Sequence, residues 1–283
     1  MNTQLLYKAQ DGKTFDLFNN DVFNLVNVDG LTVANTSIAT TTTPQIDGDE
    51  LQNIQANPRP IMLDLQIKSG LDVERAKRQI LDVIKIKQTG TLTLIQGEGN
   101  ERREMEISGV VQSVSMPRFT NAVLMQVSMY CNNSFWQDVA AVVLEISNAI
   151  PKHHFAVYFP KNNPVVLGLI NKTMQQSFNN DGDVESGMEI TFLFTGNATN
   201  PKLYNQRGEF IGVDGSFVAN DKVVISTYKG KKTITKNGVS IIGKITAGSV
   251  FLRMFTGLNV FTMTAESGRE NMLFYISFKR LFI

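Results

Sequence analysis

The sequence predicts a mostly β protein with one α-helix, arranged in two domains. Apolar and polar residues alternate over many short runs, and a period of two is the pattern of half-buried strands. One segment alone has the spacing of an amphipathic helix. The chain has 283 residues, 42% of them hydrophobic, and this length suits two domains with separate cores.

Three runs show the strand pattern most clearly. Apolar residues occupy every second position over 61–67, 188–194 and 274–278. Turn residues separate such runs, and the clearest turn is Asn237-Gly238. Asn-Gly between apolar runs favours a type I′ hairpin, because both residues tolerate a positive φ.

A helix is expected from Val73 to Gln88. Asp72 is a suitable N-cap, and Gly90 is expected to stop the helix. At 100° per residue one stripe is apolar and the opposite side is charged with both signs, so the helix is expected to lie on a sheet. The apolar stripe comprises Val73, Ala76, Ile80, Val83 and Ile84, and the charged side comprises Arg75, Arg78, Asp82 and Lys85.

The segment Asn35–Asn57 is predicted to be a long polar loop. It is rich in threonine and contains Asp47, Asp49 and Glu50 but no lysine or arginine. A loop of this length in a compact domain is usually functional or ordered by a partner, and simple surface disorder is the alternative.

The domain boundary is expected near Phe135–Asp138, which gives domains 1–138 and 139–283. The first domain contains a β–helix–β unit, and the second is a series of short strands spaced as in a β-sandwich. Residues 1–138 hold 12 Lys/Arg and 16 Asp/Glu, whereas residues 139–283 hold 15 and 10. Neither domain has the dense basic character of a protein that grips nucleic acid.

Several classes of protein are disfavoured by simple features. Cys131 is the only cysteine, so no intramolecular disulfide is possible and assembly in a reducing cytosol is expected. The first residues lack the pattern of a signal peptide, and no stretch has the ~20 apolar residues of a membrane span. Charged residues make up 19%, which fits a surface covered by partners and equally an ordinary β-rich protein.

No motif for metal binding or catalysis is complete. His153 and His154 are adjacent, so on a strand they point to opposite faces and do not form a pair. Cys131 is expected to be a small buried residue. The acidic run 181–185 lacks the glycine and the final glutamate of an EF-hand loop and is expected to be a solvated turn.

Two glycine-containing segments fail as nucleotide sites. Lys229–Thr233 lacks the upstream glycine of a phosphate loop, and Lys232 occupies its Ser/Thr position. Gly97-Glu98-Gly99 lacks the third glycine of a dinucleotide fingerprint. The sequence therefore predicts no catalytic residue, no cofactor and no metal, and no enzymatic activity.

The order of motifs in the first domain resembles that of siphophage distal tail proteins (Dit). Four segments carry the resemblance in order, namely Arg59–Ile67, Gly90–Leu94, Arg103–Met116 and Cys131–Trp136. In that family an aromatic pair like Phe135-Trp136 closes the ring-forming domain. A proline usually precedes the pair, and Ser134 stands there in this chain.

The second domain is similar to the C-terminal domain of the same family. A strand series begins at Asn180–Asp183, the Asn237-Gly238 hairpin follows, and the chain ends with 274–280. Gly257-Leu258-Asn259 matches the family's Gly-x-Asn turn, although Thr256 replaces the common proline. The resemblance implies a tail-tube-like β-sandwich or split barrel with a helix, followed by a galectin-like β-sandwich.

The resemblance also implies a function. The chain is expected to form a homohexameric ring around a channel for phage DNA at the tail tip of the virion. Its expected partners are the tail tube protein, a tail-associated lysin or fibre hub protein and the receptor-binding protein, without membrane insertion. The acidic first domain fits such a channel, because like charge keeps passing DNA from adhering.

Two other functions remain open at this point. A cell-wall carbohydrate-binding module would need exposed aromatic platforms, and the sole tryptophan, Trp136, lies at the domain junction. The tyrosines available to the second domain, Tyr158, Tyr204, Tyr228 and Tyr275, mostly lie within or beside strand patterns, so no useful sugar affinity is expected. A wall hydrolase would need a catalytic motif that the sequence does not show.

Overall fold

The computed structural model describes residues 3–32, 35–43, 47–99, 102–116, 123–145, 147–151, 168–172 and 175–283. The chain forms two compact units. The first comprises residues 1–139 together with 281–283, and the second comprises residues 140–280. The mostly β architecture predicted from alternation is confirmed, and α1 is the one α-helix in the described part of the chain.

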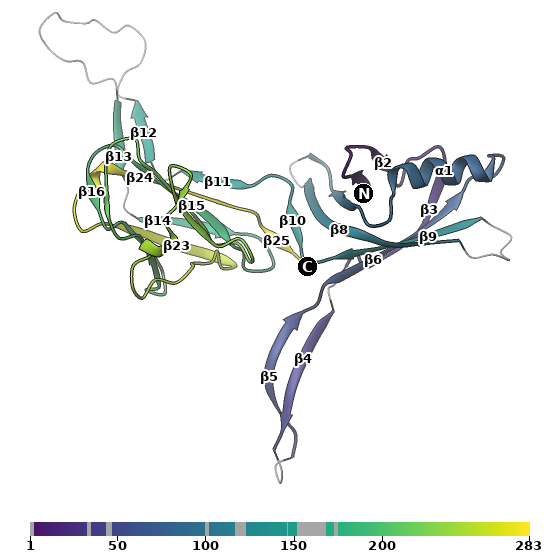
Figure 1. Cartoon of the computed structure of the whole chain (residues 1–283), viewed down its shortest axis with the longest axis horizontal. Helices are drawn as coiled ribbons and strands as arrows, with labels where there is room; N and C mark the ends of the chain where they lie inside the picture. Colours follow the sequence, from purple (N-terminus) through teal and green to yellow (C-terminus); the bar gives the residue numbers. More distant parts are fainter. Residues whose placement is uncertain are drawn as a thin grey trace, which may run out of the picture. The chain divides into compact units, whose positions relative to one another are not determined.

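The first unit is built on one sheet of nine strands (Figure 1). Its main path runs β2-β1-β7-β8-β9-β6-β3, and β10 and β25 join at the side. All pairings in this sheet are antiparallel. The strands are β1 (Thr3–Ala9), β2 (Thr14–Asp16), β3 (Phe23–Asp29), β6 (Arg59–Ile67), β7 (Thr89–Gln96), β8 (Arg103–Ser115), β9 (Leu124–Cys131), β10 (Trp136–Asp138) and β25 (Leu281–Phe282).

The predicted helix exists but is shorter than expected. Helix α1 spans Val73–Val83 and is capped by Asp72, whose side chain accepts hydrogen bonds from two backbone N–H groups. The chain then leaves the helix because Lys87 N and Gln88 O both hydrogen-bond to Val111 of β8. Gly90 therefore lies in β7 rather than at the helix end, and a Cβ on it would lie 2.4 Å from the Tyr7 ring.

The core of the first unit lies between α1 and one face of the sheet. Ala76, Ile80 and Val83 of α1 are buried. They join one cluster with alternate residues of β6, namely Ile61, Leu63, Leu65 and Ile67. The apolar stripe of the helix was therefore predicted correctly, except that Val73 is 36% exposed.

The end of the chain belongs to the first unit, which corrects the expected domain limit at 283. Strand β25 pairs with β10, placing Phe282 opposite Trp136. Phe282 is buried in the core of the first unit. Because the pairing partner of β25 lies in this unit, the second unit ends at Arg280.

The described residues of the second unit form four sheets. The larger two run β11-β24-β15-β20-β21-β22 and β14-β23-β17-β18, and β12-β13 and β16-β19 form two-stranded sheets. Short 3₁₀ helices lie at Ile242–Lys244 and Arg269–Asn271. The strands are β11 (Val142–Glu145), β12 (Ser147–Pro151), β13 (Gly168–Lys172), β14 (Gln175–Asn180), β15 (Met188–Phe194), β16 (Ala198–Thr199), β17 (Lys202–Asn205), β18 (Phe210–Gly212), β19 (Ser216–Phe217), β20 (Lys222–Ser226), β21 (Thr233–Lys236), β22 (Val239–Ser240), β23 (Gly257–Thr264) and β24 (Met272–Phe278).

Residues from both larger sheets form one buried cluster in the second unit. Ile190 of β15 and Ile276 of β24 are cross-strand partners within it, and Phe261 of β23 joins from the other sheet. The predicted Asn237-Gly238 hairpin is confirmed, because both residues have positive φ and Lys236 pairs with Val239. Over the described residues, no helix has the length and apolar character needed to cross a membrane.

Candidate functional site

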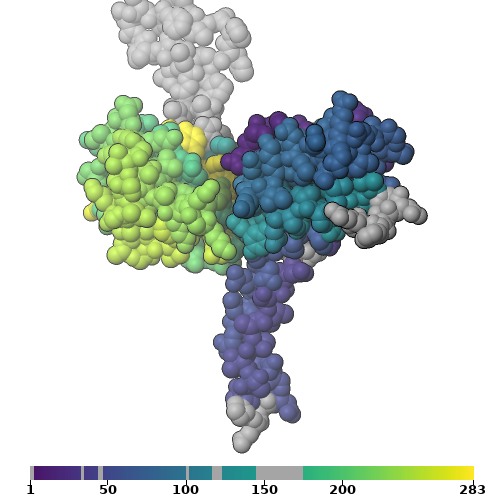
Figure 2. All heavy atoms as spheres, turned by 45° about the vertical axis from the view of Figure 1, so that its right-hand side comes forward, coloured from purple at the N-terminus to yellow at the C-terminus, as the bar shows by residue number. Residues whose placement is uncertain are grey.

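The segment predicted to be a loop is instead a β-hairpin that stands apart from the sheet. Strands β4 (Thr36–Thr42) and β5 (Asp49–Ala56) pair with each other and with no other described strand. Every residue of β4 is exposed, and so is every residue of β5 except Ala56. Threonine favours extended backbone, but the segment shows no clean alternation because neither of its faces is buried. Figures 1 and 2 show the hairpin leaving the first unit as a narrow column.

The base of this hairpin is held by a buried arginine. Arg59 is 1% exposed. Its Nε donates to Ser134 O at 2.9 Å, and its Nη1 donates to Leu31 O at 3.0 Å and to Gly30 O at 3.3 Å. Its Nη2 has no hydrogen-bond partner among the described residues. Burial lowers the pKa of the Arg59 guanidinium.

Other residues reinforce the same base. The indole Nε1 of Trp136 donates to Leu31 O at 3.1 Å, and the Ser134 hydroxyl donates to Ala56 O at 3.2 Å. Gly30 has a φ of 88°, and a Cβ there would lie 2.2 Å from Pro60 O. The hairpin is therefore anchored where it meets the sheet, and glycine is required at position 30.

Sequence reasoning recognised Trp136 but missed the role of Arg59. Alternation over 59–67 places residue 59 on the same face as the buried residues Ile61 and Leu63. A charged residue on the buried face of a strand needs hydrogen-bond partners. The position of Arg59 in this alternation was therefore enough to predict that it is a buried structural anchor.

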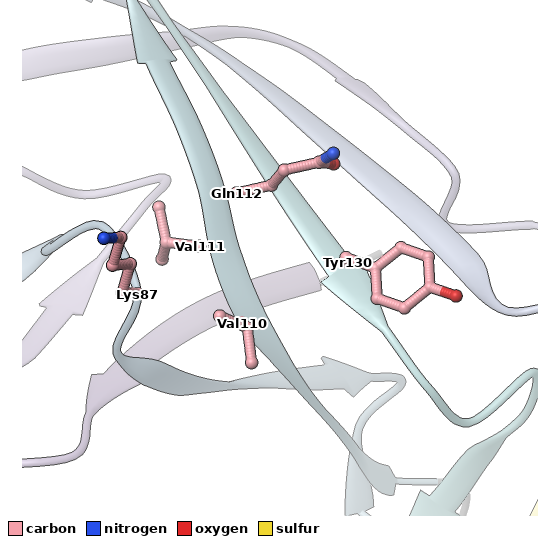
Figure 3. A pocket seen from close by; sticks show the side chains of 5 residues that line it. All are labelled: Lys87, Val110, Val111, Gln112 and Tyr130. Atoms are coloured by element: carbon pink, nitrogen blue, oxygen red, sulfur yellow. The ribbon is translucent and has the colours of Figure 1, made fainter.

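A shallow hollow lies at strands β8 and β9. Its lining consists of Lys87, Val110, Val111, Gln112 and Tyr130, and its volume is about 480 Å³ (Figure 3). Val110 and Tyr130 are cross-strand partners on β8 and β9 and are 40% and 43% exposed. Pro60 is the partner of Tyr130 on β6, so the three side chains form a row across the sheet.

The candidate metal residues do not converge. Asp181 accepts a hydrogen bond from Asn179, whereas Glu185 forms an ion pair with Arg253. Among the described residues, no three His, Cys, Asp or Glu side chains are placed to hold a metal ion. His153 and His154 lie outside the described residues.

The remaining candidates have structural roles. Cys131 is fully buried, and burial raises the pKa of its thiol to about 11. Lys229–Lys232 lies in the connection between β20 and β21, and Thr233 begins β21. Lys232 Nζ lies 5.0 Å from the Phe251 ring centroid. Gly97 and Gly99 have positive φ in the turn that follows β7.

The predicted Gly-x-Asn turn is explained by a buried asparagine. Asn259 is fully buried, and its Nδ2 donates to Phe255 O at 2.7 Å and to Gly257 O at 2.9 Å. Its Oδ1 accepts from Phe255 N at 2.8 Å, and Asn180 Nδ2 also donates to Phe255 O. The side chain therefore closes the turn before β23, and Gly257 supplies a φ of 77°.

These features agree with comparisons to known proteins. Residues 181–280 match the family model described as siphovirus-type tail component, C-terminal domain. The crystal structure of Dit from phage SPP1, described as a paradigm of hub adsorption apparatus in phages infecting Gram-positive bacteria, matches with a TM-score of 0.71 and 14% identity over 100% of both chains. No curated protein sequence matches the chain.

Two structures of the phage p2 baseplate in its activated conformation also match. The structure with calcium has a TM-score of 0.48 and the one with strontium 0.49, each at 11% identity over 99% of this chain and 98% of that chain. The family model and the SPP1 match confirm the resemblance found in the sequence. Residues 181–280 are thus similar to the C-terminal domain of siphovirus-type tail components, and the chain as a whole has the fold of the SPP1 distal tail protein.

Proposed function

We propose that the chain is the ring-forming hub component of a siphophage tail tip. Six copies of the first unit assemble into a ring around a channel, and the second units extend toward the host-adsorption apparatus. The observation that carries the proposal is the correspondence of fold over the full length of both chains with a hub protein, joined to the family match of 181–280. The role is structural rather than enzymatic.

The first unit is the part suited to self-association. Its hairpin β4–β5 exposes both of its faces to solvent, including the large side chains of Ile38, Leu51 and Ile54. Exposed strand edges and apolar side chains favour pairing with another chain. The second unit buries its own core between two sheets and can stand alone.

The first unit also suits a channel for DNA. Residues 1–138 carry 16 acidic and 12 basic side chains. A net negative wall repels phosphate and lets DNA slide without adhering. Glu104, Glu106 and Asp64 project from β8 and β6 on the side away from the buried residues of those strands, and in this proposal they face the channel.

The ring joins several tail parts. One face meets the tail tube protein, and the other meets a tail-associated lysin or fibre hub protein. The second units carry contacts to the receptor-binding protein. Assembly takes place in the bacterial cytoplasm, and the mature location is the virion tail tip.

Sedimentation velocity over a series of concentrations tests the proposal. A species of six chains of 31.5 kDa each is expected to grow with concentration, or on addition of the tail tube protein. A chain that stays monomeric under both conditions contradicts the proposal. Turbidity of cell walls that falls on addition of the chain would instead support a hydrolase.

A further inference from the structure

The second unit is inserted into the first, because the chain passes between the two units twice. It leaves the first unit after Val139 and returns to it at Leu281. Strand β25, which follows the second passage, pairs with β10, which precedes the first passage. The sheet of the first unit is therefore completed by residues that lie beyond the whole second unit in the sequence.

Phe282 completes the core of the first unit. It is 5% exposed, and Trp136, its cross-strand partner on β10, is 1% exposed. Both side chains belong to the same buried cluster, and Arg103 Cζ lies 5.8 Å from the Phe282 ring centroid. Cross-strand partners on one face of a sheet pack against each other, so the indole of Trp136 loses part of its cover when Phe282 is not in place.

Trp136 connects this packing to the segment that leads into β4. Its indole Nε1 donates to Leu31 O at 3.1 Å, and Arg59 Nη1 donates to the same oxygen at 3.0 Å. The Leu31 side chain packs against the core of the first unit. Phe282 therefore supports, through Trp136, the part of the first unit from which the hairpin β4–β5 emerges.

The second unit brings the two ends of its own chain segment together. Strand β11 pairs with β24, and Val142 lies opposite Phe278. The Cα atoms of such partners are about 4.5–5.5 Å apart. Val142 comes four residues after Asp138, where β10 ends, and Phe278 comes three residues before Leu281, where β25 begins. The folded second unit therefore holds the chain ends that lead to β10 and β25 close together.

The length of the loop decides how readily β25 pairs with β10. The paired residues are about 140 positions apart in the sequence, but only about seven flexible positions separate them once β11 has paired with β24. The probability that a flexible loop closes falls roughly as the −3/2 power of its length. Pairing of β25 is therefore about 100-fold more favourable when the second unit is folded.

We infer that the folded second unit is required to complete the first unit, and that a copy therefore self-associates only after its second unit has folded. This inference rests on the proposed ring and adds a control of assembly to it. Residues 1–139 are synthesised before the second unit, and their core stays incomplete at Trp136 until Phe282 has paired. Copies with an unfolded second unit are thereby kept out of the ring.

Unfolding the second unit within the full-length chain tests this control. Ile276 of β24 is fully buried, so Ile276→Asn places a polar amide in the apolar core of the second unit. Trp136 is the only tryptophan, and its fluorescence reports on the first unit. At a urea concentration that leaves the unaltered chain folded, the variant is expected to lose second-unit structure by circular dichroism. Under the same conditions Trp136 is expected to become accessible to acrylamide, and the variant to sediment as a monomer.

A disulfide between β10 and β25 separates this control from general damage to the chain. Gln137 and Leu281 are cross-strand partners, so Gln137→Cys together with Leu281→Cys places two thiols within the range of a disulfide. The bond replaces the short connection that the folded second unit provides. In the Ile276→Asn background, the oxidised form is expected to restore the protection of Trp136 and self-association, whereas the reduced form is expected to restore neither.

The matched control is Val143→Asn. Val143 precedes Leu144, the cross-strand partner of Ile276, and is 66% exposed. The control introduces the same side chain on the neighbouring strand without altering the core. It is expected to keep the second unit folded, Trp136 protected and self-association equal to that of the unaltered chain.

The outcomes separate this inference from the proposed ring. If the second unit of the Ile276→Asn variant is unfolded and the variant still protects Trp136 or associates as the unaltered chain does, the inference is overturned. If the oxidised disulfide restores neither property, the role of the second unit in holding β25 is overturned. If the unaltered chain never associates, even with the tail tube protein, the proposed ring falls. The protection of Trp136 then supports or overturns the completion of the first unit by the second.

Discussion

At the scale of single residues, the first unit depends on a cation placed among backbone carbonyl groups. Arg59 binds Gly30, Leu31 and Ser134 and thereby joins three chain segments that are distant in sequence. Ser134 takes part through its carbonyl oxygen as well as its hydroxyl. A proline at this position would keep the carbonyl and lose the hydroxyl, so the departure from the family pattern adds one hydrogen bond.

Arg59→Met is expected to destabilise the first unit by about 2–4 kcal/mol. The substitution keeps most of the apolar stem but removes the donor to Gly30 O and Ser134 O, whereas Leu31 O keeps the hydrogen bond from Trp136. Urea unfolding of the full chain, followed by the fluorescence of Trp136, measures the change. Arg78→Met, at an exposed position on α1, is the matched control, and an equal effect at both sites would refute the anchoring role.

The thiol of Cys131 is expected to resist modification in the folded chain. Burial raises its pKa from 9.0 to about 11, although the nearby Arg59 lowers it in part. The protonated thiol is thus favoured in the folded state, so its contribution to stability is fully present below pH 9 and is lost as pH rises toward 11. Labelling by a thiol reagent at pH 8 checks this, with Thr41→Cys as an exposed reference. Equal labelling rates at the two positions would contradict the burial argument.

At the scale of elements, the sequence predicted the strands and the helix whose residues are periodically buried. It missed the elements that are not shaped by burial. Strand β6 was predictable because fully buried residues occupy every second position, and the start of α1 was predictable because its buried residues recur every three or four positions. The hairpin β4–β5 was not, because both of its faces are solvated and no apolar period arises. The end of α1 was also missed, because it is decided by backbone pairing with Val111 from β8, which local propensity does not encode.

Deleting residues 38–55 is expected to abolish ring formation while leaving both cores folded. The hairpin contributes no residue to either buried cluster, so its loss removes a contact surface rather than core packing. Circular dichroism and sedimentation of the same sample check both statements. Normal assembly without the hairpin would exclude it from the interface.

Removing Leu281–Ile283 is expected to destabilise the first unit and not the second. Phe282 is 5% exposed in the core of the first unit, and its strand pairs with β10. Loss of one buried aromatic side chain costs about 3–5 kcal/mol. Differential scanning calorimetry that resolves two transitions would show which one moves. Ile283→Ala, at a position that is 51% exposed, serves as control, and a shift confined to the second transition would contradict the assignment.

At the scale of the whole molecule, the two units differ in what they expose to solvent. The first exposes a hairpin that pairs with no other described strand, whereas the second buries a core between its two larger sheets. A fold alone does not determine function. The order of motifs along the chain was the feature that allowed the family to be predicted from the sequence. The interface residues could not be predicted, because exposed side chains in a monomer sequence have no periodic signature.

The second unit is expected to bind no simple glycan with useful affinity. The rings of Tyr204 and Phe210 lie 5.2 Å apart, and Lys202 Nζ lies 5.3 Å from the Phe210 ring centroid. This lysine occupies part of the aromatic surface that a sugar ring would need. Calorimetry against wall teichoic acid fragments and a glycan array is the check, and micromolar binding would favour the carbohydrate-binding alternative.

The most direct test of the central claim is electron microscopy of the full-length chain incubated with the tail tube protein of its phage. The account predicts closed rings of six copies with a central channel, formed by the unaltered chain. Rings are expected to be missing when residues 38–55 are deleted. Fields of single 31.5 kDa particles under all conditions, or rings joined only through the second units, would contradict the account.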